Sequence, residues 1–323
     1  MTVTDPLLEG LNPEQQKAVA HAGSPLLVVA GAGSGKTRVL TRRIAYIMAR
    51  REVRPYEILA ITFTNKAAGE MKERVAELVG PIAKSMWVST FHSSCVRMLR
   101  QEVERLGYSS SFSIYDSADS QKLISRVMET LNLDSKRYPA RQFQHLISSA
   151  KNELQTPYEY LSKATNQFET IVADVYTMYE KRLQQANAMD FDDLIMKTVQ
   201  VLQKHPEAKS RFRSRFRHIL VDEYQDTNHA QYALIKELTG TEGDGYPIAE
   251  LCVVGDADQS IYGFRGATIR NILQFEVDYP NATTVLLEQN YRSTQNILNA
   301  ANAVITKNES RKEKNLWSDA GSG

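Results

Sequence analysis

Short, continuous runs of apolar residues recur along the chain, and each ends in small or polar residues. Runs rich in Val, Ile and Leu that do not alternate with polar residues are typical of parallel strands covered on both faces. Helical spacing between the first runs predicts helices over Thr37–Ala49 and Lys66–Val79, so strands and helices alternate and the fold class is α/β. The predicted strands are Leu26–Ala30, Ile58–Phe63, Trp87–Phe91, Ile219–Val221, Leu251–Val254 and Val285–Leu287.

The middle of the chain has a different pattern. From about Asp116 to about Asn187 no run resembles a buried strand, and apolar residues recur at helical spacing instead. Asp116, followed three residues later by Asp119, predicts the capped start of a helix. We therefore expect an all-helical insertion within the α/β domain. The Gly-, Asp- and Pro-rich stretch Gly240–Pro247 predicts an exposed loop.

Composition and charge narrow the classes of protein. The chain has 323 residues, of which 42% are hydrophobic and 24% charged, as expected for a soluble protein of two or three domains. A net charge of +1 gives no global basic field, so any nucleic-acid site has to be local. Two distant cysteines, Cys95 and Cys252, favour a reducing, cytoplasmic compartment. No signal peptide and no apolar run of about 20 residues is present, so no membrane association is expected.

A glycine-rich loop follows the first predicted strand and opens a helix. Its glycines allow backbone N–H groups to surround phosphate oxygens, and Lys36 can reach the β- and γ-phosphates of a nucleotide. The Thr37 hydroxyl can bind Mg²⁺. Alone, this loop indicates a nucleotide-binding protein and does not separate kinases, GTPases and transporters. The candidate ATP-binding residues here are Ala32, Gly33, Ser34, Gly35, Lys36, Thr37 and Arg38.

Two carboxylates, Asp222 and Glu223, directly follow the predicted strand Ile219–Val221. Asp222 is placed to bind the Mg²⁺ that accompanies ATP, and Glu223 to activate a water molecule for attack on the γ-phosphate. An acidic pair that caps the next helix is the structural alternative. Together with the glycine-rich loop, the pair favours hydrolysis over transfer to another substrate.

The phrase Asp222–Asp226 resembles motif II of the UvrD/PcrA/Rep superfamily 1 DNA helicases, and further motifs of that family follow in order. Leu11–Gln16 resembles the Q motif, in which the residue matching Gln15 recognises adenine. The resemblance implies a RecA-like parallel-sheet NTPase domain with an inserted helical subdomain. An amide side chain suits adenine because it both donates and accepts hydrogen bonds.

Two further segments resemble the DNA-contacting motifs of this family, and both lie where predicted strands lead into helices. They imply DNA contacts for the residues Thr62, Phe63, Asn65, Thr90 and His92. Phe91 is expected to belong to the core instead. The basic cluster from Lys209 to His218 is expected to be a solvated helix whose Phe212 and Phe216 pack inward, although a DNA patch is the alternative.

The segment Val254–Gly266 resembles motif III. The resemblance implies that Gln259 senses the γ-phosphate and that Tyr262, Phe264 and Arg265 line a groove for single-stranded DNA. Many relatives carry Trp where this chain has Phe264, so a weaker stacking platform is expected.

The segment Leu287–Ser293 resembles motif IV. It implies that Tyr291 stacks on adenine and that Arg292 acts as an arginine finger on the γ-phosphate. Lys151 and Asn152 are weaker candidates for DNA phosphate contacts.

The resemblance also divides the chain. Residues 1–115 and 189–293 correspond to the two parts of the RecA-like subdomain 1A, 116–188 to the inserted subdomain 1B, and 294–323 to a linker and the start of a second RecA-like domain. Motifs V and VI are absent. The chain therefore looks like the N-terminal half of a longer protein, with weak nucleotide binding and little hydrolysis of its own.

For the longer protein the resemblance implies an ATP- and Mg²⁺-dependent 3′-to-5′ single-stranded DNA translocase and helicase, active in DNA repair or replication at the nucleoid. Single-stranded DNA, junctions with duplex DNA, and repair or replication proteins would be its partners. Three alternatives stay open from the sequence. They are another class of P-loop enzyme, a non-catalytic DNA- or partner-binding module, and a RecB-like helicase that carries a nuclease domain.

Overall fold

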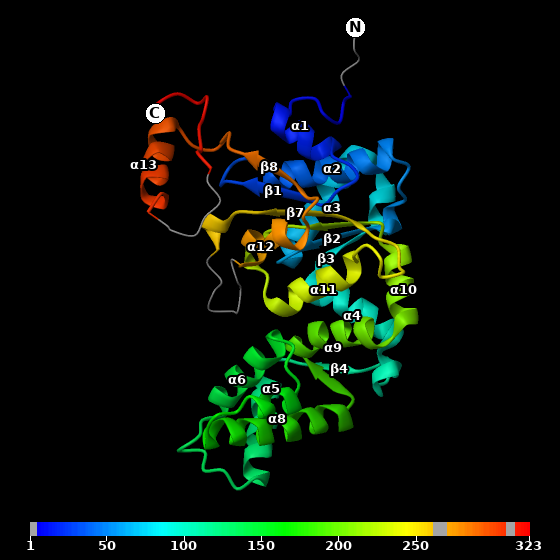
Figure 1. Cartoon of the computed structure of the whole chain (residues 1–323), viewed down its shortest axis with the longest axis vertical. Coiled ribbons are helices and arrows are strands. Elements are labelled where there is room, and N and C mark those ends of the chain that lie inside the picture. Colours follow the sequence, from blue (N-terminus) through cyan, green and yellow to red (C-terminus); the bar gives the residue numbers. More distant parts are fainter. Residues whose placement is uncertain (1–4, 261–269, 308–313) are drawn as a thin grey trace. The chain divides into compact units, whose positions relative to one another are not determined.

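The structure is a computed structural model that describes residues 5–260, 270–307 and 314–323. It contains two compact units. The first comprises residues 1–91, 210–227 and 238–323, and the second comprises 92–209 and 228–237 (Figure 1). The predicted helical insertion, 116–188, lies inside the second unit. In the described residues no helix is long and apolar enough to cross a membrane.

A six-stranded parallel sheet forms the centre of the first unit, in the order β3-β2-β6-β7-β1-β8. All six strands predicted from the apolar runs are confirmed, with ends that differ by at most two residues. Since every strand runs the same way, the residues that follow each strand gather at one edge of the sheet. The strands are β1 (Leu26–Ala30), β2 (Ile58–Thr62), β3 (Trp87–Thr90), β6 (His218–Val221), β7 (Glu250–Gly255) and β8 (Thr283–Leu287).

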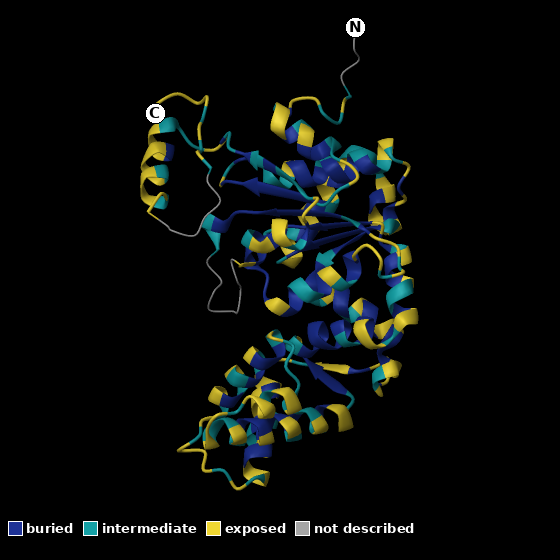
Figure 2. Ribbon diagram, viewed as in Figure 1, coloured by how far each residue is buried: buried dark blue, intermediate teal, exposed yellow. Residues whose placement is uncertain are grey.

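Helices pack on this sheet, and the strands are buried on both faces, as Figure 2 shows in dark blue. Alternate residues such as Leu26, Val28 and Ala30 of β1 share one core with the apolar sides of α1, α2 and α3. On α12, Phe275 packs edge-on against Tyr224 at 5.9 Å. The helices wholly within this unit are α1 (Pro13–Ala20), α2 (Lys36–Arg50), α3 (Asn65–Val79), α12 (Arg270–Asp278) and α13 (Gln295–Ile305).

The second unit is mainly helical. Its described helices surround a core around Val127, Phe143 and Tyr176, and two short strands pair in parallel beside them. Asp116 and Asp119 form the predicted capping box at the start of α5. Its elements are β4 (Ser113–Tyr115), α5 (Ser117–Thr130), α6 (Ala140–Asn152), α7 (Pro157–Ser162), α8 (Gln167–Gln185), β5 (Ala188–Asp190) and α9 (Phe191–Lys204). The chain passes between the units within or next to α4 (Phe91–Glu102), α10 (Pro206–Arg215) and α11 (His229–Thr239).

A buried ionic network occupies the interior of the second unit. The Lys151 Nζ lies 2.6 Å from Glu180 Oε1, 2.7 Å from Asp190 Oδ2 and 3.0 Å from Asp193 Oδ1, and its side chain is fully buried. Lys197 pairs with Glu180 and Asp193 as well. The hypothesis that Lys151 contacts DNA phosphate is therefore wrong, because three carboxylates inside the fold hold its ammonium group.

The basic cluster before β6 is partly as expected. Phe212 and Phe216 are buried and stack with ring centroids 6.3 Å apart. Arg213 is not solvated, however, because it is 3% exposed and pairs with Asp244 of the Gly240–Pro247 loop. Arg215 lies over the Trp87 ring at 4.6 Å. Helical spacing predicted the inward phenylalanines but gave no sign of these distant partners.

Candidate nucleotide-binding site

The glycine-rich loop between β1 and α2 lies at the edge of the sheet formed by the carboxyl ends of the strands. Gly33 and Gly35 have φ angles of +70° and +87°, which only glycine adopts without strain. Gly35 is the N-cap of α2 and offers no side-chain cap. The first-turn N–H groups of α2 are therefore available to an anion, with the favourable end of the helix dipole behind them.

The glycine-rich loop lies next to the acidic pair that follows β6. Lys36 Nζ lies 2.8 Å from Glu223 Oε2, so the residues after β1 and after β6 are brought together as predicted. Asp222 is 8% exposed, and burial, followed by the neighbouring charge of Glu223, raises the pKa of its carboxyl to about 6. A divalent cation beside this group would favour its charged form.

Glu223 has an unusual backbone, with φ +49° and ψ +44°. A non-glycine residue in this left-handed region costs on the order of 1 kcal/mol and is most often kept where it aims a side chain. Gln225 stabilises the arrangement, since its Nε2 donates to Glu223 Oε2 at 2.9 Å and its Oε1 accepts from Asp256 N at 2.9 Å. Gln225 was not predicted as a site residue, although it stands inside the Asp222–Asp226 motif.

Residues after β8 close on the phosphate loop. Asn290 Nδ2 donates to Ala32 O at 2.5 Å, and Tyr291 N donates to Gly33 O at 2.9 Å. Asn290 Oδ1 also accepts from the backbone N of Arg292 at 2.7 Å. A Cβ added to Gly33 would lie 2.8 Å from Arg292 Cβ, so Arg292 begins directly beside the loop. Asn290, which the sequence analysis did not single out, thus positions both partners.

The residues predicted to bind adenine are also joined to the loop. Gln15 is 1% exposed, its Nε2 donates to Ser34 O at 2.9 Å, and its Oε1 accepts from Asn12 N at 3.2 Å. Asn12 Nδ2 donates to Tyr291 Oη at 2.9 Å. Tyr291 is 52% exposed, so its ring face is open to a stacking partner. Both ends of the Gln15 amide already have protein partners, which the sequence could not show.

Motif III contributes Gln259 to the same edge. Gln259 follows β7 on the short helix η5 (Ala257–Gln259), and its Nε2 donates to Asp256 Oδ2. Asp256 in turn is bonded to Gln225, so a chain of contacts runs from Lys36 through Glu223 and Gln225 to Asp256. Tyr262, Phe264 and Arg265 lie outside the described residues.

The remaining loop residues differ in exposure. Ser34 is buried and its Oγ donates to Gly31 O at 2.7 Å, so it braces the loop from inside. Ala32 and Arg38 are exposed, and Gly33, Gly35 and Thr37 are half-buried. All of these candidates lie on a single short segment, and the glycines orient its backbone.

The candidate DNA contacts follow β2 and β3. Phe63 is half-buried and packs edge-on against the buried Phe91 at 5.7 Å, which confirms Phe91 as a core residue. Asn65 is exposed at the first turn of α3. Thr62 is 1% exposed and its hydroxyl donates to Thr64 O, so it shapes the turn from inside. Thr90, at 9% exposed, is nearly buried at the end of β3.

His92 belongs to the second unit, where Phe191 lies beside it with ring centroids 5.6 Å apart. Burial lowers the pKa of His92, so the imidazole is neutral near pH 7 and can donate or accept a hydrogen bond. Phe191 is 51% exposed at the start of α9. Phe191 was not predicted as a site residue, and its place as the aromatic at the first position of a capped helix was the available signal.

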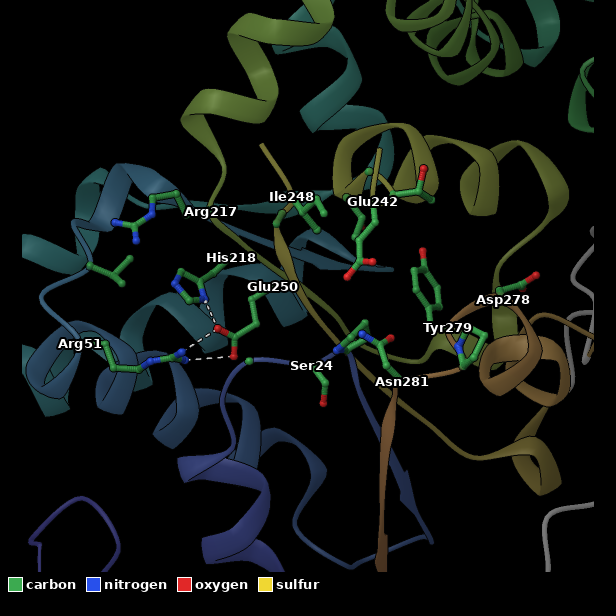
Figure 3. Close-up of a pocket in the computed structure, with 18 residues that line it drawn as sticks. Ser24, Arg51, Arg217, His218, Glu242, Ile248, Glu250, Asp278, Tyr279 and Asn281 are labelled. Atoms are coloured by element: carbon green, nitrogen blue, oxygen red, sulfur yellow. Dashed lines mark hydrogen bonds and ion pairs between the residues drawn. The ribbon is translucent and has the colours of Figure 1, made fainter. Parts of the chain in front are cut away.

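A cavity of about 740 Å³ lies elsewhere in the first unit. It lies at the opposite edge of the sheet, where β6, β7 and β8 begin, and Figure 3 shows Arg51, His218 and Glu250 on its wall. Arg51 pairs with Glu250 at 2.8 Å, and burial lowers the pKa of His218 to about 4. No candidate residue in the described part of the chain lines this cavity.

Comparison with known proteins identifies two family models along the chain. The model of the UvrD/REP helicase N-terminal domain matches residues 11–280, and the UvrD-like helicase C-terminal domain model matches 285–323. The chain is 62% identical to ATP-dependent DNA helicase UvrD1 of Mycobacterium bovis, over 99% of the chain and 42% of that protein.

It is also 53% identical to ATP-dependent DNA helicase PcrA of Bacillus subtilis, over 99% of the chain and 43% of that protein. Against PcrA of Staphylococcus aureus it is 53% identical, over 96% of the chain and 42% of the relative. The chain thus spans roughly two-fifths of the length of these relatives. It belongs to the UvrD/REP helicase family.

Proposed function

We propose that this chain binds ATP and single-stranded DNA as part of an ATP-dependent 3′-to-5′ DNA translocase and helicase. The observation that carries the proposal is the Lys36–Glu223 contact at 2.8 Å, with Arg292 beside Gly33 at the same edge of the sheet. A lysine, a carboxylate base and an arginine around a glycine-rich loop are what transfer of a γ-phosphoryl group to water requires.

The side chains divide the reaction between them. Lys36 and Arg292 neutralise charge on the phosphoryl oxygens as the bond between the β–γ bridging oxygen and the γ-phosphorus breaks. Glu223 accepts a proton from the attacking water, whose oxygen forms the new bond to phosphorus, and ADP and phosphate are the products. Gln225 keeps the Glu223 carboxylate in place, and Gln259 contacts the γ-phosphate.

The residues fit a magnesium ion bound together with ATP. Among the described residues no group of three His, Cys, Asp or Glu side chains could hold a metal alone. Mg²⁺ in nucleotide sites keeps several waters and takes one or two protein oxygens, for which Thr37 and Asp222 suffice. When bound, the ion neutralises negative charge on the β- and γ-phosphates.

Single-stranded DNA is the second ligand we propose. Phe63 and Asn65 in the first unit, and His92 in the second, offer an aromatic face and polar groups to bases and phosphates. Thr62 and Thr90 are assigned to the same motifs, as are Tyr262, Phe264 and Arg265 outside the described residues. Junctions with duplex DNA, a role in repair or replication at the nucleoid and the associated protein partners belong to this proposal.

The proposed division into subdomains 1A and 1B implies that this segment supplies only part of the hydrolytic site. We therefore expect the 323-residue chain to bind ATP weakly and to hydrolyse it slowly, with little stimulation by DNA. Steady-state hydrolysis should be measured with and without oligo-dT, beside fluorescence titrations with ATP and with labelled oligo-dT. Binding of neither ligand, or turnover that Glu223→Gln leaves unchanged, would contradict the proposal.

A further inference from the structure

The segment that follows the last described helix returns to the nucleotide edge. Trp317 N donates to Glu288 O at 3.1 Å, and Asn290 N donates to Trp317 O at 2.8 Å, so residues 288–290 and 315–317 run side by side. Asn302 of α13 also binds this segment, since its Nδ2 donates to Leu316 O at 2.9 Å. These bonds fix the position of the residue before them, Lys314.

Lys314 lies between the two acids of motif III. Its Nζ pairs with Asp256 Oδ1 and with Asp258 Oδ2, and its side chain is only 4% exposed. The side chains of Asp256 and Asp258 are also buried, with 3% and 10% of their surface exposed. A buried carboxylate is costly unless a cation compensates it, so Lys314 allows both acids to stay charged beside the sheet edge.

Asp256 holds Gln259. The Gln259 Nε2 donates to Asp256 Oδ2, while the other oxygen of the same carboxylate accepts from Lys314. Lys314 therefore orients the Asp256 carboxylate, and this carboxylate in turn positions the Gln259 amide. The backbone N of Asp256 is bonded to Gln225, which leads on to Glu223.

The charges at this edge of the sheet also indicate a role for Lys314 in binding a triphosphate. Asp222, Glu223, Asp256 and Asp258 all follow strands that end at one edge of the sheet, and four carboxylates there disfavour a triphosphate. Lys36 compensates Glu223, and Lys314 compensates the two acids of motif III. Loss of Lys314 would remove this positive charge from beside the residue that we propose contacts the γ-phosphate.

We infer that Lys314 is a positioning residue for the γ-phosphate contact, which couples the segment after α13 to discrimination between ATP and ADP. The inference rests on the proposed function, because it assumes that Gln259 meets the γ-phosphate. It predicts an effect on the triphosphate that the diphosphate does not share, whereas a purely structural ion pair would alter the affinity for both nucleotides equally.

The test is an equilibrium titration of the 323-residue chain with adenosine 5′-(β,γ-imido)triphosphate and with ADP, in Mg²⁺. Lys314→Ala should lower the affinity for the triphosphate by about tenfold, the value of one charge-assisted hydrogen bond, and leave ADP affinity within twofold. Lys314→Arg should restore the preference, and Lys307→Ala, an exposed lysine at the end of α13, should change neither affinity.

A double-variant cycle with Gln259→Ala makes the test specific. If Lys314 acts through Gln259, the second substitution should add less than twofold to the first. An unchanged ratio of triphosphate to ADP affinity in Lys314→Ala, or an equal loss for both nucleotides, would overturn the inference while the proposed function stands. If the unsubstituted chain binds neither nucleotide, or Lys36→Ala has no effect, the proposed function itself fails.

Discussion

Two lysine–carboxylate clusters, one in each unit, use the same chemical groups in opposite ways. In the first unit Lys36 pairs with Glu223 on a glycine-rich loop, and Glu223 is one-third exposed. In the second unit Lys151 is fully buried and surrounded by Glu180, Asp190 and Asp193. Both clusters lie at the start of a helix, but Asp190 caps α9 with its side chain, whereas Gly35 leaves the first turn of α2 without a side-chain cap.

The difference teaches how to separate a ligand site from a structural network. The Lys151 cluster satisfies its charges internally, and Tyr179 adds a hydrogen bond to Asp190 at 2.9 Å. Burial, followed by the neighbouring charge of Asp193, raises the pKa of Asp190 above its ordinary value. At the Lys36 cluster the first-turn N–H groups of α2 have no side-chain cap, so they can donate to anionic oxygens. Each cluster predicts a different response to loss of its lysine.

The largest effect on stability should come from Lys151→Ala. Removal of the ammonium takes away the lysine that pairs with Asp190 and leaves Glu180 and Asp193 with Lys197 alone, and loss of one partner of a buried ion pair costs about 3–5 kcal/mol of unfolding free energy. Urea unfolding followed by circular dichroism measures this value. Lys181→Ala, an exposed lysine on the neighbouring helix α8, is the control and should change stability by less than about 0.5 kcal/mol. A loss below about 1 kcal/mol in Lys151→Ala would contradict the structural role.

Lys36→Ala should have a large effect on nucleotide affinity and a small effect on stability. We expect nucleotide affinity to fall about 100-fold, or roughly 2.7 kcal/mol, because two charge-assisted hydrogen bonds to phosphate are lost. Stability should change little, since the Lys36 partner Glu223 can turn to solvent. Calorimetric titration with Mg²⁺·ATP and an unfolding curve on the same sample give both numbers. If Lys36→Ala lowered the free energy of unfolding as much as the free energy of nucleotide binding, the proposed difference between Lys36 and Lys151 would be contradicted.

Glycine substitutions sharpen the comparison at the level of the backbone. Gly33→Ala forces a side chain into the left-handed region and within 2.8 Å of Arg292 Cβ, so it should cost about 1–2 kcal/mol and weaken nucleotide binding. Gly69→Ala is the matched control, because Gly69 lies in α3 with no atom near its added Cβ. It should raise stability by up to about 1 kcal/mol. Thermal unfolding distinguishes the two, and a neutral Gly33→Ala would show that the loop geometry is not required.

The smallest effect concerns pH. The Asp222 pKa of about 6 lies above its ordinary value of 3.8, so the folded chain binds the extra proton between these values. The stability from this group is therefore complete at low pH and is lost as pH rises through about 6. Mg²⁺ must displace that proton, so Mg²⁺-dependent nucleotide affinity should fall as pH drops below about 6, by up to tenfold per unit. Titrations at pH 7.5 and pH 5 measure it, and Asp222→Asn should remove the dependence.

Much of the fold was predictable from the sequence because its signals are local. Continuous apolar runs marked all six strands of the large sheet, and the glycine, lysine and acidic residues at their ends marked the edge where Lys36 meets Glu223. Partners distant in sequence were not predictable. Nothing in the local pattern around Lys151 indicates that Glu180 and Asp190 surround it, and nothing around Lys314 points to Asp256.

The central claim is that the loop at Gly35–Thr37, the Asp222–Glu223 pair and Arg292 meet one triphosphate. A crystal structure of the chain with Mg²⁺ and adenosine 5′-(β,γ-imido)triphosphate tests it most directly. We predict phosphate oxygens within about 3 Å of Lys36 Nζ and of the Arg292 guanidinium. A nucleotide bound instead in the cavity between His218 and Asp278, at the other edge of the sheet, would contradict the account.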